Sequence, residues 1–177
     1  MDASVSRLKK SAPPHEKSAL SLAKSPRSAA GPVEISWSTA KHPLSDRAVR
    51  RIARAALHHG ERAGLPIAVV FVTDKALARM HGRWLGDGRP TDVISFDLSG
   101  EGGGPAGELY ISVQRAAAVA RRRGVRVERE LALYLVHGCL HLCGFDDHGA
   151  RARAKMRSAE RAVLAGLGFE DDPTPFE

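Results

Sequence analysis

One stretch of the chain, from Glu128 to His148, decides the fold, and it reads ERELALYLVHGCLHLCGFDDH. Its residues 131–142 are apolar nearly all round, and a helix of that kind is expected to be buried rather than to lie on a surface. The pattern therefore predicts a buried helix over residues 127–142. Gly144 can adopt the left-handed backbone that ends such a helix and turns the chain back.

Three histidines in this stretch, His137, His141 and His148, have the spacing of metal ligands. His137 and His141 are four residues apart, so both imidazoles point from one face of the helix, about one turn apart. Burying two polar rings without partners costs free energy, and a shared cation offsets that cost. The turn after the helix can bring His148 to the same ion. Three imidazoles with one open position are the usual arrangement of catalytic zinc, so the sequence predicts one Zn2+ per chain.

The composition fits one globular domain. The chain has 177 residues, of which 43% are hydrophobic and only 5% aromatic, so aliphatic side chains must form most of the core. No apolar run is long enough to span a bilayer and no signal core lies near the N-terminus, which indicates a cytoplasmic protein without a membrane partner. Two cysteines, Cys139 and Cys143, lie on the predicted metal helix and are expected to be reduced thiols. Cys143 remains open as an alternative metal ligand.

The net charge of +7 is distributed unevenly along the chain. Residues 1–31 hold six Lys or Arg against two acids, lack hydrophobic periodicity and are predicted to be a disordered basic tail. Four arginines cluster at residues 121–126. A basic excess favours anionic partners, above all nucleic acid. We therefore expect a tail at residues 1–31, one domain at 32–170 and a second, short tail at 171–177.

The rest of the chain alternates between strand and helix patterns. Ser45 can cap a helix, Asp74 is expected to cap the next one, and Pro66 introduces a β-branched run, IAVVFV, that is typical of a buried strand. The predicted fold class is α+β: a single domain with one mixed four-stranded sheet covered by helices, among them the buried metal-bearing helix. The expected strands are 33–37, 67–72, one within 89–98, and 108–113, and the expected helices are 45–61, 74–83, 114–123, 127–142 and 151–167.

The motif HGCLHLCGFDDH resembles the signature of the YbeY family of metal-dependent endoribonucleases, whose usual form is HGxLHLxGYDH. Two upstream segments agree in order: PTDVISF, within residues 84–96, resembles the family's PT(D/N)VLSF, and GELYIS at 107–112 resembles its GDIxIS strand. The resemblance covers roughly residues 33–165. It implies a zinc-dependent endoribonuclease that hydrolyses phosphodiester bonds in single-stranded RNA, in ribosomal RNA maturation and ribosome quality control. Ribosomal RNA or ribosomal particles are the partners that it implies.

The chain departs from the family pattern at the third histidine. The second and third histidines of the family are usually six residues apart, whereas His141 and His148 are seven apart because Asp146 and Asp147 replace a single Asp. By the resemblance, the role of third ligand is carried to His148. Asp147 stays open as an alternative ligand, because zinc also accepts carboxylates.

Catalytic side chains other than metal ligands are not assigned. Leu85 stands where many members of the family carry a basic residue, and Arg83, two residues away, is the nearest substitute. Asp146 or Asp147 has two roles open to it: to orient a histidine through its free ring nitrogen, or to form the turn.

Two rival functions share part of this pattern. Metzincin proteases use HExxHxxGxxH, and two histidines and Gly144 match it, but Gly138 stands where those enzymes carry a glutamate. Without that acid, peptide hydrolysis by the same route loses the group that takes the proton of water. The other rival is a non-catalytic ribosome-assembly factor with a structural zinc. Such sites are normally closed by four protein ligands, so Cys143 or Asp147 would complete the shell.

Overall fold

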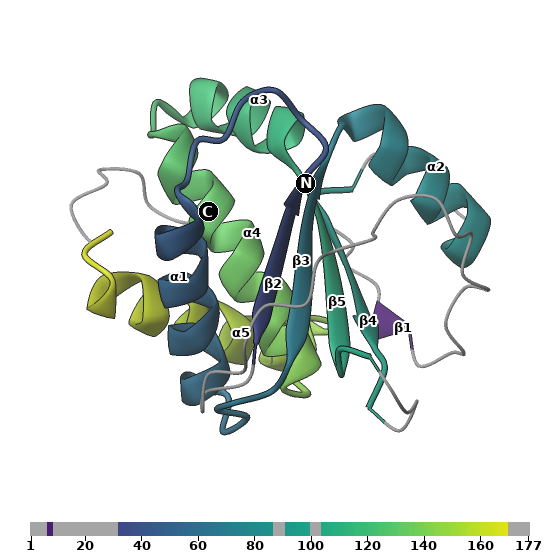
Figure 1. Ribbon diagram of the computed structural model, residues 1–177. Helices are drawn as coiled ribbons and strands as arrows, with labels where there is room; N and C mark the ends of the chain where they lie inside the picture. The colour runs from purple at the N-terminus through teal and green to yellow at the C-terminus, as the bar shows by residue number, and fades with distance from the viewer. Residues whose placement is uncertain (1–6, 9–31, 87–90, 100–103, 170–177) are drawn as a thin grey trace.

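The computed structural model describes residues 7–8, 32–86, 91–99 and 104–169. These residues form an α+β domain in which helices cover one mixed sheet, and this confirms the predicted fold class (Figure 1). The strands are β1 (Arg7–Leu8), β2 (Val33–Trp37), β3 (Ile67–Val72), β4 (Val93–Asp97) and β5 (Gly107–Ser112). The helices are α1 (Asp46–His59), α2 (Asp74–Leu85), α3 (Val113–Arg123), α4 (Val127–Leu142) and α5 (Ala150–Gly166).

The strands of the sheet lie in the order β1-β4-β5-β3-β2. β2, β3 and β5 are parallel, and β4 runs antiparallel to β5, so the sheet is mixed as predicted. The four predicted strands form it, and β1 adds a two-residue strand that pairs parallel to β4. β1 falls within the tail that we expected to be disordered; the other residues of that tail, and the expected tail at 171–177, lie outside the described residues. The sheet therefore has one strand more than the sequence predicts, at the edge beside β4.

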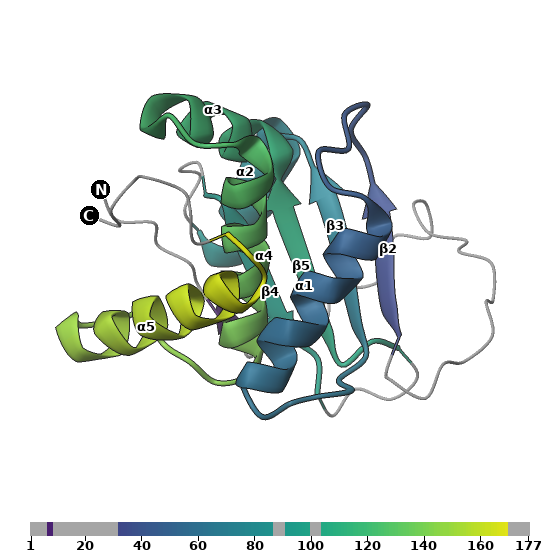
Figure 2. The same cartoon turned by 90° about the vertical axis from the view of Figure 1, so that its left-hand side faces the viewer.

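Helices lie on both faces of the sheet. α2 covers one face, where it packs on a small apolar cluster that includes Val70, Leu77 and Phe96. α1, α4 and α5 lie on the other side, over the main core, and α3 packs on one end of α4 (Figure 2). α4 is the central helix, because it contacts α1, α3, α5 and two strands of the sheet. Within the described ranges, no helix is both long and apolar enough to cross a lipid bilayer.

α4 is buried on nearly every side, as its sequence predicts. A glycine lets it lie close to the sheet: a Cβ on Gly138 would be 3.0 Å from Leu109 Cδ2 and 3.1 Å from Val93 Cγ2. Glu130, in the first turn of α4, is also buried and pairs with Arg123 from the end of α3 at 3.2 Å. The helix is thus fixed against the sheet on one side and tied to α3 at its start, and this fixes where its histidines point.

Some predicted boundaries move by one or two residues, although Ser45 caps α1 and α4 has its predicted bounds. The side chain of Thr73, rather than that of Asp74, caps α2 by accepting an amide of the first turn. Asp74 is already helical, and its carboxylate accepts the Ser112 hydroxyl at 2.6 Å. Ser112 also caps α3, so Val113 begins the helix instead of ending β5. Short polar side chains at a strand end stop the strand because they offer the next amides a helix cap.

Candidate metal centre

α4 ends in a turn that returns the chain toward the helix. The amide of Phe145 donates to the carbonyl of Leu140, and the amide of Gly144 donates to the carbonyl of His141, both at 3.0 Å. This pair of bonds is the Schellman motif, and Gly144 has the left-handed backbone predicted for it, with φ of 91°. The turn brings the loop of residues 146–148 back beside the end of α4.

His137 and His141 point at one spot from one face of α4. Their Nε2 atoms are 3.0 Å apart, and their ring planes cross at 84°. Each ring is anchored at its other nitrogen: Nδ1 of His137 bonds the carboxylate of Glu160, and Nδ1 of His141 bonds the carbonyl of Phe145 at 3.0 Å. A carbonyl and an ionised carboxylate only accept hydrogen bonds, so each neutral ring carries its proton on Nδ1. The Nε2 lone pairs of the two rings then face each other.

Facing lone pairs fit a divalent cation. Two Nε2 atoms at this separation repel unless a proton or a cation lies between them, and neutral imidazole nitrogen is an ordinary zinc donor. Burial lowers the pKa of His137, but the hydrogen bond and charge of Glu160, together with the charges of Asp92 and Asp147, outweigh burial and leave the pKa raised. The carboxylates therefore favour positive charge at this ring. Histidines that bind metals are commonly anchored in this way through the second nitrogen.

Glu160 is a part of the site that the sequence analysis missed. It lies on α5 with a side chain only 8% exposed, on the same buried face as Met156 and Val163. A carboxylate buried to this extent needs a partner, and the ring of His137 is its partner. The available signal was an acid on the apolar face of a predicted helix. α5 thus carries the group that orients a ring on α4.

Asp147 supplies a third donor atom. Its Oδ1 is 4.0 Å from Nε2 of His141, and donor atoms of His137, His141 and Asp147 all lie within 4.8 Å of one another. Burial raises the pKa of Asp147, the nearby His137 and His148 lower it, and on balance it is raised. A carboxylate with two imidazoles is an accepted zinc ligand set. The alternative that the sequence left open for Asp147 is therefore the one that the geometry brings together.

The ring of His148 lies outside this group of three donors. Its side chain is 72% exposed, and its Nδ1 is 2.7 Å from Oδ1 of Asp146 and 3.5 Å from Oδ1 of Asp147. Asp146 also accepts the amides of Asp147 and His148, so it both forms the turn and orients the histidine. The hydrogen bond with His148 lowers the pKa of Asp146, and the same bond raises the pKa of His148. Of the predicted trio, the structure brings His137 and His141 together. The ring of His148 contacts Asp147 instead and is not part of the group of donors that the two other rings join.

Comparisons with known proteins agree with the motif. The family model described as Endoribonuclease YbeY matches residues 34–168. The chain belongs to the YbeY family. Two proteins named Endoribonuclease YbeY are similar to it. The one from Anaeromyxobacter dehalogenans is 39% identical over 132 residues, which are 72% of this chain and 68% of the relative. The one from Symbiobacterium thermophilum is 34% identical over 133 residues, 68% of this chain and 85% of the relative.

A solved structure has a similar fold. The solution structure of a Thermotoga maritima protein matches with a TM-score of 0.53, over 82% of this chain and 99% of that one. The sequence identity of 21% makes this a likeness of fold. The family match and the similar relatives confirm the resemblance that the motifs indicate.

Because the chain belongs to the YbeY family, the offset between the second histidine and the third donor can be compared with the family pattern. In the family pattern the third histidine stands six residues after the second, and Asp147 stands six residues after His141. Asp147 therefore stands at the position in the chain where the YbeY pattern has its last histidine, and its carboxylate is also the one that lies among the gathered donors. The offset indicates Asp147, whereas residue type indicates His148.

The sequence also offers Cys143 as an alternative metal ligand and Arg83 as a substitute for the basic residue of the family, and the structure shows what each of them contacts. Cys143 packs on the end of α1, since a Cβ on Gly60 would be 2.4 Å from its Sγ, and among the described residues it joins no group of clustered metal donors. Both cysteines are unbridged thiols, as predicted. Arg83, two residues before Leu85 in the chain, lies with its Cζ 5.6 Å from the ring centroid of Trp84.

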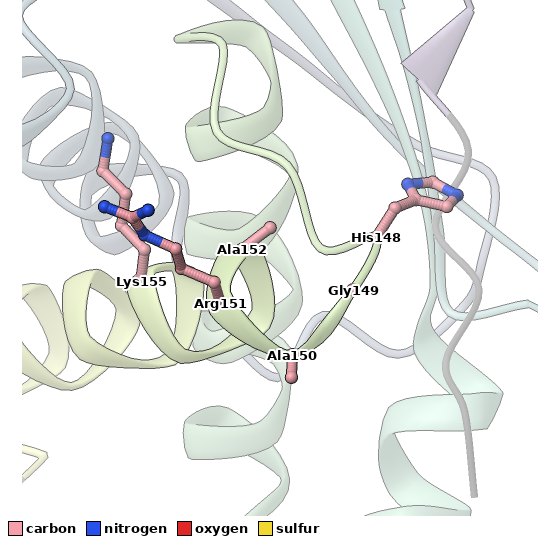
Figure 3. A pocket seen from close by; sticks show the side chains of 6 residues that line it. All are labelled: His148, Gly149, Ala150, Arg151, Ala152 and Lys155. Atoms are coloured by element: carbon pink, nitrogen blue, oxygen red, sulfur yellow. The ribbon is translucent and has the colours of Figure 1, made fainter.

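A surface pocket adjoins the candidate metal centre at the start of α5 (Figure 3). Figure 3 shows the ring of His148 on one side of the connecting loop and the side chains of Arg151 and Lys155 on the other. The three gathered donors do not line the pocket. Cationic side chains thus stand beside the exposed rim of the site. The lining residues are His148, Gly149, Ala150, Arg151, Ala152 and Lys155.

Proposed function

We propose that this chain is a zinc-dependent endoribonuclease that cuts single-stranded RNA during ribosomal RNA maturation and ribosome quality control, in the cytoplasm. Family membership supports nuclease activity, since the similar proteins are named endoribonucleases. The observation that carries the proposal is the pair of imidazole Nε2 atoms 3.0 Å apart, each ring anchored through its Nδ1. We assign the activity to a domain at residues 32–170, with tails at 1–31 and 171–177.

We further propose that His137 and His141 hold one zinc ion and that the loop of residues 146–148 supplies the third donor. The position of Asp147 favours its carboxylate in that place. The sequence-based choice, His148, stays a prediction, and its ring is in contact with Asp147. Either choice leaves one position of a tetrahedral ion for solvent or substrate.

The residues of the chain prepare this site for phosphodiester chemistry. When bound, a divalent cation would acidify a coordinated water and neutralise charge on a phosphoryl oxygen. Glu160 holds a proton at Nδ1 of His137, and the Phe145 carbonyl does the same for His141, so that both Nε2 atoms face the cation. The exposed rim beside His148 leaves the site open to an RNA strand.

The packing of α4 disfavours a metzincin-like peptidase. Gly138 stands where those enzymes carry their glutamate base. A Cβ there would meet side-chain atoms of Leu109, Val93 and Ser95 at 3.0–3.3 Å, so position 138 faces the sheet and not the open side of the site. A glutamate base has no room at this position, and this supports the nuclease over the peptidase.

The non-catalytic alternative requires a fourth protein ligand. The gathered group contains three donors, and Cys143, the sulfur ligand considered from the sequence, packs against Gly60. With these three donors alone, an ion would keep one position for solvent or substrate, and this favours catalysis over a purely structural role.

Elemental analysis together with an RNA cleavage assay tests the proposal. We expect the purified protein to hold about one zinc per chain and to cut unstructured ribosomal RNA until a chelator is added. His137→Ala should remove metal and cleavage together. His58→Ala, at an exposed position in the last turn of α1, should change neither. Cleavage by metal-free His137→Ala would contradict the proposal, as would a zinc-loaded wild type that cuts no RNA.

A further inference from the structure

α5 carries an exposed row of arginines that begins beside the candidate metal centre. Arg153, Arg157 and Arg161 are four residues apart, which places them along one side of the helix, and all three are exposed. Nη1 of Arg153 donates to the main-chain carbonyl of Asp147 at 3.4 Å. The row, here called the arginine stripe, therefore starts at the loop that offers the third metal donor and runs along α5 past Glu160, which bonds the ring of His137.

No exposed acid of α5 balances the arginine stripe. Glu160, the only acid of the helix, is buried and bonded to the ring of His137. None of the ion pairs between described residues includes Arg157 or Arg161. Like charges four residues apart oppose helix formation, and an anion that runs alongside relieves this repulsion. The charge pattern of α5 thus matches an extended anionic partner.

The position of α5 leaves room for such a partner. Figure 2 shows the helix extending outward from the body of the domain, with its N-terminal half away from the sheet. Residues 153–161 span about 12 Å at ~1.5 Å per residue, which matches about four phosphates at the ~3.4 Å spacing of a stacked strand. Arginine suits phosphate because its planar guanidinium donates hydrogen bonds in pairs.

We propose that the arginine stripe binds the sugar–phosphate backbone of RNA on one side of the bond that is cut. This inference rests on the proposed nuclease function and adds the surface that holds the substrate strand. Contacts with phosphates position a strand without reading its bases. The stripe therefore makes binding depend on strand length and on salt, and not on sequence.

A matched pair of variants tests the arginine stripe in the full-length, zinc-loaded protein. The test variant is Arg157→Gln/Arg161→Gln, which leaves Arg153 and its contact with the metal-centre loop in place. The control is Arg121→Gln/Arg122→Gln, which removes the same charge from exposed positions on α3, at the other end of the domain (Figure 1). Glutamine is a good helix former, so both variants should fold. Circular dichroism checks that they do.

The probe is a fluorescent single strand of 2′-O-methyl RNA, which keeps the phosphates and resists cleavage. For a strand of about 20 nucleotides, between ~50 and 200 mM salt, the slope of log affinity against log salt should become shallower by about 1.4 in the test variant, or ~0.7 per lost phosphate contact. The α3 control should keep the wild-type slope. A short strand of about two nucleotides should bind the test variant and wild type alike, because its one phosphodiester is the reacting bond itself and does not extend along the stripe.

An unchanged slope in Arg157→Gln/Arg161→Gln would overturn the inference, and so would an equal loss in the α3 control or in binding of the short strand. Wild-type cleavage of unmodified RNA separates the two proposals. If the wild type cuts RNA but the slopes do not differ, the stripe fails and the nuclease stands. If the slopes differ as expected but the wild type cuts no RNA, the backbone-binding surface stands and the nuclease fails.

Discussion

The helical half of the candidate metal centre is buried and anchored by the fold, whereas two of the three side chains in its loop half are open to water and only Asp147 is largely buried. His137 and His141 extend from the central helix, and each ring is bonded at Nδ1 to an acceptor that the fold holds in place. In the loop half, Asp146 and His148 have side chains 61% and 72% exposed, and they bond mainly to each other and to their own backbone. A donor held in place before binding loses less freedom when a metal arrives. Metal affinity should therefore reside mainly in the helical half.

Metal removal should give the largest effect, because the proposed ion would bind the folded helical half and not the unfolded chain. At a zinc concentration of about 100 times Kd, the free energy of unfolding should exceed that of the chelated protein by about 2.7 kcal/mol. His137→Ala should lose this gain. Thermal unfolding with zinc and with chelator measures this gain in stability. Equal unfolding temperatures for the wild type would contradict the claim that the helical half binds metal.

Glu160→Gln should weaken zinc binding by about 10–100-fold, because a neutral amide holds the ring of His137 less firmly and no longer fixes its tautomer. Calorimetric zinc titration measures the loss. Ser158→Ala, at an exposed position on the same helix, is the control and should bind zinc as the wild type does. An unchanged affinity in Glu160→Gln would mean that the buried carboxylate serves packing alone.

The helical half is also the half that the sequence predicts well. Spacing of four residues on a helix and a glycine at its end are local rules, and both hold at this site. Glu160 escapes such rules because it lies 23 residues from His137, on another helix, so that the contact depends on how α5 packs. In the loop, residue type indicates His148 and offset indicates Asp147. The side chain that faces the helix depends on the backbone of the turn, which no propensity specifies.

The same division applies to the fold. The bounds of α4 follow from a long apolar run with a glycine turn behind it. Thr73 and Asp74 are both good capping residues, so the sequence alone does not decide between them. β1 contains two residues and depends on an edge offered by β4, far along the chain, so nothing in its own sequence indicates a strand.

Gly138→Ala tests how firmly the helical half is seated and should give an effect of intermediate size. Its Cβ would crowd Leu109 and Val93, and such overpacking typically destabilises by about 1–3 kcal/mol. Gly166→Ala, in α5, would meet nothing within 4 Å and should stabilise by up to about 1 kcal/mol. Urea unfolding compares the two variants. Equal stability of Gly138→Ala and wild type would contradict the close seating of α4 on the sheet.

His148→Ala should give the smallest effect, a loss of zinc affinity below about fivefold, because its ring is exposed and lies outside the gathered donors. Asp147→Ala should cost more, because it removes a donor atom of the group. Zinc titration of the two variants side by side measures the difference. If His148→Ala loses zinc while Asp147→Ala retains it, the third place belongs to His148, as the residue type indicates.

X-ray absorption at the zinc edge of the purified protein is the most direct test of whether two anchored imidazoles, with Nε2 atoms 3.0 Å apart, bind a metal. The spectrum should show two imidazole rings, with a carboxylate oxygen at about 2.0–2.2 Å and a solvent oxygen completing the shell. A shell without imidazole, or a protein that takes up no zinc at all, would contradict the claim that the two anchored histidines of α4 bind a metal.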